Sequence, residues 1–190
     1  FLLQISKKGR NFDVENICRK IEDNIALREN ISLKEVTKIL WAITGFRSLY
    51  FNLFEKFTNI IEKESKNADS WDLSMILWSF SRISSPRAES IIKSLESQCL
   101  DKISEFSITE FLYVLRAYSE NLFGTKTLHF EFFTKIKGNI IDFSLQELAI
   151  VMHCLNCLSE LYKELSLFQQ LTIKIIQRIE YLKTSLKIVE

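Results

Sequence analysis

A histidine and two cysteines in one short segment, His153-Cys154-x-x-Cys157, have the clearest capacity for chemistry. Thiols at this spacing can bind a metal ion or form a redox pair. A structural zinc site needs four ligands, and the sequence holds no second Cys-x-x-Cys pair. No strand-to-helix pattern of the thioredoxin type surrounds the motif. We therefore interpret the segment as packing, with a metal or redox site as the alternative.

Arrangements typical of an enzyme do not stand out elsewhere in the sequence. His129 and His153 have no evident nucleophile as a partner, there is no glycine-rich phosphate loop, and the carboxylates are scattered. We therefore predict a protein that is not an enzyme, with no catalytic residues, no cofactor, no metal and no small-molecule substrate. An active site of an uncatalogued kind is the alternative.

Basic side chains on segments that we expect to be helical are the candidate RNA-binding residues. They are Lys34, Lys38, Arg82 and Arg116. If these helices line the inner surface of a stack, the four cations project toward one groove and can contact phosphates. The alternative is an ordinary solvated face, because 25 Lys and Arg are balanced by 24 Asp and Glu, for a net charge of +1. A dedicated nucleic-acid binder usually has a clear basic excess.

Tryptophan offers a second way to contact RNA, because every base has a flat face that can stack. Trp41 and Trp78 lie beside the expected apolar stripes, so packing within or between repeats is the preferred interpretation. Trp71 falls in the first turn of an expected helix, outside the stripe. It is therefore the better candidate for an exposed contact.

A pattern that occurs four times carries these residues. Each copy begins with a helix-capping residue and has an acidic residue three positions later, and successive copies start 37, 38 and 37 residues apart. The pairs are Ser32/Glu35, Asp69/Asp72, Ser107/Glu110 and Ser144/Glu147. The cap accepts a hydrogen bond from the first turn, and the acidic residue bonds back to the backbone. A fixed period of this length is typical of stacked helical repeats.

Each cap precedes apolar residues at i, i+3, i+4 and i+7, which predicts an amphipathic helix. One aligned position holds only small residues, as close approach of two helices requires. These residues are Ala42, Ser79, Ala117 and Cys154. A second helix is expected in each copy, at residues 53–64, 88–100, 130–137 and 165–183. Residues 1–6 and 14–27 are expected to form a partial pair at the N-terminus.

The fold class that follows is all-α, an α-solenoid of stacked antiparallel helix pairs with a period of about 37 residues. We predict one domain over residues 1–190, with a partial repeat (1–30) and full repeats at 31–68, 69–106, 107–143 and 144–190. Four Gly and one Pro suit an all-helical chain. No apolar run reaches the length of a bilayer span, so no membrane span is expected. The start at Phe1 would be explained by a removed targeting segment or a missing disordered end.

The aligned helix cores read ILWAITGF (39–46), ILWSFSRI (76–83), VLRAYSEN (114–121) and VMHCLNCL (151–158). The first two resemble the Leu-Trp-Ala-Phe-(Ala/Ser)-Lys-Leu core of the repeats in FAST-kinase-like and RAP-domain proteins. They are also similar to the octotricopeptide and heptatricopeptide repeats of organelles, and the period suits the heptatricopeptide class best. In the third and fourth cores, Arg116 and His153 replace the tryptophan. No RAP domain is recognisable, so no activity of that domain is carried over.

The resemblance implies an organellar, usually mitochondrial, protein that binds RNA or stabilises RNA-containing assemblies. In parasites with fragmented mitochondrial ribosomal RNA, similar proteins are built into the mitochondrial ribosome. We therefore expect a structural component of a mitochondrial ribonucleoprotein in the matrix, and the mitochondrial ribosome is the preferred assembly. The expected partners are ribosomal or other organellar RNA and neighbouring proteins. The alternative is a protein scaffold or accessory subunit of another mitochondrial complex without RNA contact. A freestanding RNA-processing factor would instead bind RNA with a strong dependence on salt.

Overall fold

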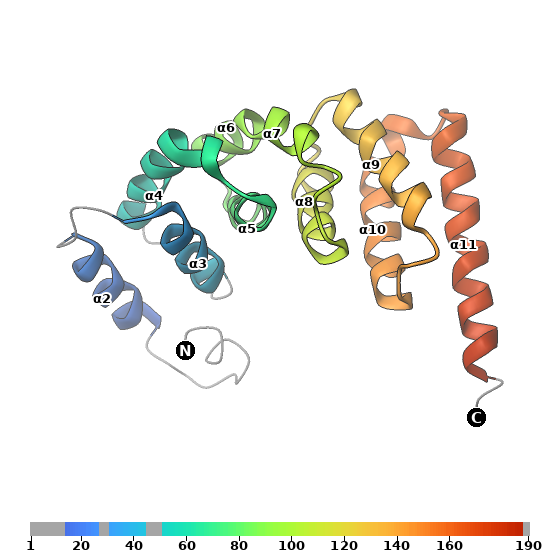
Figure 1. Cartoon of the computed structure of the whole chain (residues 1–190), viewed down its shortest axis with the longest axis horizontal. Helices are drawn as coiled ribbons and strands as arrows, with labels where there is room; N and C mark the ends of the chain where they lie inside the picture. The colour runs from blue at the N-terminus through green and yellow to red at the C-terminus, as the bar shows by residue number, and fades with distance from the viewer. Residues whose placement is uncertain (1–13, 27–30, 45–50, 188–190) are drawn as a thin grey trace. The chain divides into compact units, whose positions relative to one another are not determined.

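The computed structural model describes residues 14–26, 31–44 and 51–187 (Figure 1). Within these ranges all regular elements are helices and no strand occurs, which confirms the predicted all-α class. In chain order the elements are α2 (Val14–Ala26), α3 (Leu33–Thr44), α4 (Phe51–Glu64), the 3-10 turn η1 (Ser65–Asn67), α5 (Ser70–Ser81), α6 (Pro86–Ser94), α7 (Glu96–Asp101), α8 (Ile108–Glu120), α9 (Lys126–Asn139), α10 (Leu145–Tyr162) and α11 (Ser166–Lys187). The chain divides into two compact units, Phe1–Leu95 and Glu96–Glu190, which we describe one at a time.

The first unit is organised around the contact between α3 and α5. Helix α4 also packs on α3, and α6 packs on α5. The apolar stripes predicted for α3 and α5 are buried, as Leu40 and Leu77 show with 0% exposure each. The rings of Phe54 and Phe80 add an aromatic contact with 5.1 Å between centroids. Burial of each large apolar side chain contributes about 1.5–3 kcal/mol.

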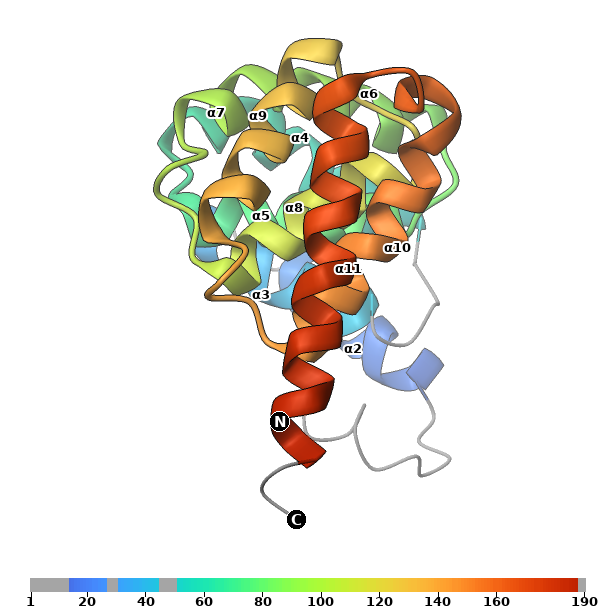
Figure 2. The ribbon, with the colours of Figure 1, turned by 90° about the vertical axis from the view of Figure 1, so that its right-hand side faces the viewer.

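The second unit repeats this arrangement, with α8 packed against α10. Helix α11 contacts both α9 and α10, and α7 contacts α9. Figure 2 looks onto α11, with α9 and α10 on either side of it. The rings of Phe133, Tyr162 and Phe168 meet edge to face, with centroids 5.4 Å and 5.6 Å from that of Phe133. This aromatic cluster joins α9, α10 and α11.

Capping explains where the first helix of each pair begins. Ser107 and Ser144 form complete capping boxes with Glu110 and Glu147. Ser32 and Glu35 also bond in both directions, at 3.1 Å and 3.4 Å. The remaining pair, Asp69 and Asp72, departs from the predicted capping box. Asp69 accepts from the Asp72 backbone N–H at 2.8 Å, but the shorter Asp72 side chain makes no bond back, and its Oδ1 is buried without a hydrogen-bond partner.

Two of the predicted second helices differ from the structure. The helix expected at residues 88–100 is interrupted at Leu95, which separates α6 from α7. At this point the Ile91 carbonyl accepts both the Leu95 backbone N–H, at 3.2 Å, and the Ser94 hydroxyl, at 2.8 Å. The helix expected at 130–137 is longer, because Thr125 caps α9 and helical structure starts at Lys126.

The aligned small-residue position lies inside the packed helices. Ser79, Ala117 and Cys154 are 0% exposed and Ala42 is 5% exposed, as close helix approach requires. Helix α2 agrees with the predicted helix at 14–27, whereas residues 1–6 lie outside the described residues. The solenoid arrangement, its period and the single-domain organisation stay predictions. In the part of the chain that the structure describes, no helix has the length and apolar character needed to cross a membrane.

Candidate functional site

Two of the predicted RNA-binding residues, Lys34 and Lys38, lie one turn apart on α3 and are exposed. The Lys34 ammonium donates a hydrogen bond to Asp69 Oδ2 at 2.9 Å, and Asp69 is the N-cap of α5. This hydrogen bond and the charge of Asp69 raise the pKa of Lys34. Among the described residues, Lys38 makes no hydrogen bond or ion pair. Lys34 therefore already holds an anion of its own unit, and Lys38 is the more available cation.

The start of α5 places two carboxylates close together. Burial raises the pKa of Asp69, but the hydrogen bonds from the Asp72 N–H and from Lys34 outweigh this effect, and the net pKa is lowered. Burial and the charge of Asp69 raise the pKa of Asp72, which is 1% exposed. Asp69 is therefore the ionised cap, and Asp72 is the carboxyl that resists ionisation.

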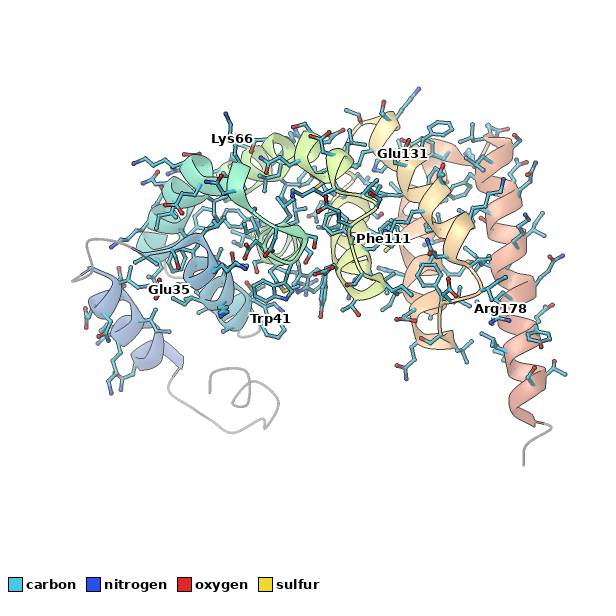
Figure 3. All side chains as sticks on the ribbon, viewed as in Figure 1. Glu35, Trp41, Lys66, Phe111, Glu131 and Arg178 are labelled. Atoms are coloured by element: carbon cyan, nitrogen blue, oxygen red, sulfur yellow. The ribbon has the colours of Figure 1, made fainter. Side chains whose placement is uncertain are left out.

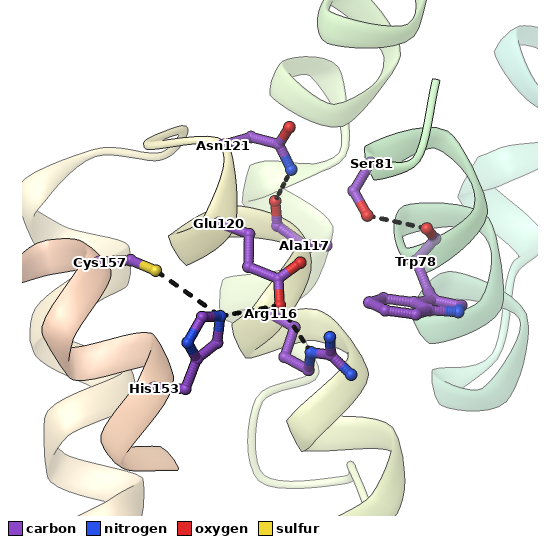
Figure 4. Close-up of polar contacts among 8 residues, drawn as sticks. All are labelled: Trp78, Ser81, Arg116, Ala117, Glu120, Asn121, His153 and Cys157. Atoms are coloured by element: carbon purple, nitrogen blue, oxygen red, sulfur yellow. Dashed lines mark hydrogen bonds and ion pairs between the residues drawn. The ribbon is translucent and has the colours of Figure 1, made fainter. Parts of the chain in front are cut away.

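Arg82, the third candidate, is the C-cap of α5. Its guanidinium carbon lies 5.2 Å from the centre of the Trp78 ring, which is a cation–π contact. Figure 4 includes Trp78, whose backbone carbonyl accepts a hydrogen bond from Ser81 Oγ at 2.8 Å. Trp41 and Trp78 are half-buried, and so is Trp71, the better candidate for an exposed contact by sequence. The two stripe-adjacent tryptophans are thus neither core residues nor fully open to solvent.

Arg116, the fourth candidate, belongs to a polar cluster on the second unit (Figure 4). Its Nε donates to Glu120 Oε1 at 2.8 Å, four residues along α8. His153 Nε2, from α10, lies 3.4 Å from the same oxygen, and Cys157 Sγ lies 3.9 Å from His153 Nε2. The Glu120 side chain is 18% exposed and the His153 side chain 56%. Glu120 therefore joins α8 to α10 at a surface where an arginine and a histidine are both accessible.

The thiols of this region are poorly suited to redox chemistry. Cys154 is 0% exposed, and burial raises its pKa to about 12. Burial and the charge of Glu120 raise the pKa of Cys157. Reactive cysteines need the opposite shift, toward the thiolate. Within residues 14–26, 31–44 and 51–187, no group of three His, Cys, Asp or Glu is arranged to hold a metal ion.

The remaining histidine, His129, belongs to α9, faces Tyr162 of α10 and is 1% exposed. Its Nδ1 lies 2.7 Å from the Tyr162 hydroxyl. Burial lowers the pKa of His129 below its ordinary value. A neutral imidazole held by a tyrosine suits a structural role.

A depression of about 270 Å³ lies beside Tyr162 on the second unit. It is lined by Lys126, Phe130, Leu161, Tyr162, Glu164 and Leu165. Phe130 is 38% exposed and Leu161 56% exposed. Apolar side chains that rim a hollow in this way are typical of protein contacts.

The four predicted residues are therefore divided between the units, with Arg116 in the second and the other three in the first. The residue that sequence reasoning missed is Glu120, which contacts Arg116 and His153. Its spacing of four residues from Arg116 was the available signal, because oppositely charged side chains at i and i+4 meet on a helix. The contact with His153 depends on the packing of α8 on α10 and has no local signal.

Comparison with known protein families, with curated proteins and with solved structures finds no match to this chain.

Proposed function

We propose that this chain is an α-solenoid protein that acts as a structural RNA- and protein-binding component of a mitochondrial ribonucleoprotein in the matrix. The mitochondrial ribosome is the preferred assembly. The observation that carries the proposal is the packing between first helices of successive repeats. In the first unit α3 packs on α5, and in the second unit α8 packs on α10. This packing brings aligned positions of successive repeats onto neighbouring helices. The period of about 37 residues and the two tryptophan-containing cores support the organellar repeat class.

The electrostatics favour a built-in component over a factor that captures free RNA. Lys34 is paired with Asp69, and Arg116 with Glu120. The net charge of the chain is +1. Because the electrostatic part of RNA affinity grows with the number of phosphates neutralised, such a surface binds RNA weakly by itself. Neighbouring proteins of an assembly would supply the remaining affinity.

Crosslinking of RNA in the purified assembly tests this proposal. Lys34, Lys38, Arg82 and Arg116 are changed together to Glu, and the crosslinks to this chain are compared with the wild type. We expect the crosslinks to be lost, because each cation that neighbours a phosphate becomes an anion. The matched control changes four exposed lysines outside the first helices to Glu, at Lys63, Lys66, Lys126 and Lys137. Equal crosslinking by both variants would contradict a role for the four candidate residues.

The second candidate function is a protein scaffold without RNA contact. Apolar side chains exposed on the second unit favour it, namely Phe130 and Leu161 at the depression and Ile173 and Ile176 on α11. On this alternative, the purified assembly holds the chain and gives no RNA crosslink to it. Changing Phe130 and Leu161 to Ser would then release the chain from its partners.

A further inference from the structure

One position of the repeated pattern carries a planar side chain in every copy. Trp41, Trp78, Arg116 and His153 occupy it, at spacings of 37, 38 and 37 residues, directly before the small buried position. Three of them are half-buried, and His153 is exposed. Arginine and histidine are poor core residues, so packing alone does not account for this position. Indole, guanidinium and imidazole are the groups on which proteins stack unpaired bases.

The second unit shows directly that two successive residues of this series share one surface. Arg116 on α8 and His153 on α10 both reach Glu120 Oε1, at 2.8 Å and 3.4 Å (Figure 4). Cys157 Sγ, one turn along α10, lies 3.9 Å from the same imidazole nitrogen, Nε2. These contacts hold the guanidinium and the imidazole in place while leaving the His153 side chain 56% exposed. Side chains that are already ordered lose less entropy when they bind.

The first unit carries the two tryptophans on the equivalent pair of helices. Trp41 projects from α3 (Figure 3), and α3 packs against α5, which bears Trp78. The Arg82 guanidinium lies over the Trp78 ring, one turn further along α5. In the second unit, the residues four positions after Arg116 and His153 are Glu120 and Cys157, which bring no positive charge. The planar groups of the second unit therefore lie beside an anion and a thiol, which suits base faces better than phosphates.

We propose that each unit presents two stacking positions for unpaired bases of a single-stranded RNA, Trp41 and Trp78 in the first unit and Arg116 and His153 in the second. This inference rests on the proposed RNA contact and names the side chains that would make it. Stacking tolerates any base, so recognition is of single-stranded RNA rather than of one sequence. Binding through these positions depends on salt less steeply than phosphate contacts do.

Titration of a fluorescein-labelled 12-nucleotide oligoadenylate with the whole chain, followed by anisotropy, tests the proposal. Loss of one base–aromatic stack weakens binding about fivefold or more. We expect this loss for Trp41→Leu and for Trp78→Leu. Trp71→Leu is the matched control, a half-buried tryptophan outside the series, and its affinity should stay within about twofold of the wild type. An abasic ribose-phosphate strand of the same length should bind weakly to all of them.

A gain of affinity provides a test that does not depend on tolerance of the tryptophan changes. His153→Trp adds a larger stacking surface at an exposed position, and we expect it to tighten oligoadenylate binding about fivefold. Asn156→Trp, exposed on the same helix but outside the series, should leave the affinity unchanged. If the abasic strand binds as tightly as oligoadenylate and the variants do not change the affinity, stacking is overturned. The proposed RNA-binding function would then rest on phosphate contacts. No binding by the wild type and by His153→Trp would also overturn stacking, and the crosslinking of the assembly separately decides the function.

Discussion

The Lys34 ammonium on α3 donates a 2.9 Å hydrogen bond to the Asp69 carboxylate, which is the cap of α5. A residue that the sequence suggested as a phosphate contact is thus bound to the start of the next repeat. Both side chains are about half or more exposed, at 65% and 49%. Exposed pairs of this kind contribute little to stability. The stronger effect of Asp69 is its bond to the Asp72 N–H.

Replacement of Asp69 should separate its role as a cap from its role as an ion-pair partner. Asp69→Ala removes both, and the free energy of unfolding should fall by about 1 kcal/mol. Asp69→Asn keeps an efficient cap and loses the charge, so its stability should stay close to that of the wild type. Urea unfolding followed by circular dichroism measures both. A loss in Asp69→Asn as large as in Asp69→Ala would show that the ion pair dominates.

Truncation of a buried leucine should cost far more than truncation of an exposed one. Leu77 is 0% exposed in α5, and Leu77→Ala should lower the free energy of unfolding by about 2–5 kcal/mol through lost burial and a cavity. Leu161, which is 56% exposed, is the matched control, and Leu161→Ala should change stability by less than about 0.5 kcal/mol. Comparable losses in the two variants would contradict the burial of Leu77 in the core of the first unit.

The buried His129 should make the stability of the chain fall in mild acid. Burial lowers its pKa, so below about pH 6.5 the unfolded chain takes up a proton that the folded chain resists. The free energy of unfolding should therefore decrease as the pH falls from about 6.5, by at most about 1.4 kcal/mol per pH unit. Thermal or urea unfolding between pH 5 and 7.5 measures this slope. His129→Gln should lose this part of the slope, whereas the exposed-site control His153→Gln should retain it.

Leu122 adopts a backbone conformation that favours glycine, with φ of 55° just after α8. Its side chain is 56% exposed, so little packing is lost when it is removed. Leu122→Gly should raise the free energy of unfolding by about 0.5–1 kcal/mol, because the left-handed conformation costs a leucine about 1–2 kcal/mol. Leu122→Val should lower it, since a branched side chain is strained further there. Two variants with the same melting temperature would contradict this assignment of strain.

Features that depend on local sequence were predictable. The starts of α8 and α10 follow from Ser107 and Ser144, because a capping box uses only residues within one turn. The all-α class follows from apolar spacing for the same reason. The break at Leu95 was not predictable in this way, because the apolar spacing continues through it from Ile91 and Ile92 to Leu95 and Cys99.

The candidate site was harder to predict, since its contacts join different helices. The spacing of Arg116 and Glu120 predicts their pairing, but the approach of His153 depends on how α10 packs on α8. Similarly, nothing in the composition indicates that Lys34 reaches Asp69 rather than solvent. Two of the four candidate cations, Lys34 and Arg116, are thus already paired with carboxylates.

The central proposal is that the chain is a built-in component of a mitochondrial ribonucleoprotein. Its most direct test is purification of the tagged chain from isolated mitochondria, with quantitative mass spectrometry of the proteins and sequencing of the RNA. We expect ribosomal proteins and ribosomal RNA to be recovered in a fixed ratio to the chain. Recovery of the chain in a complex that holds no RNA, or its absence from mitochondria, would contradict the proposal.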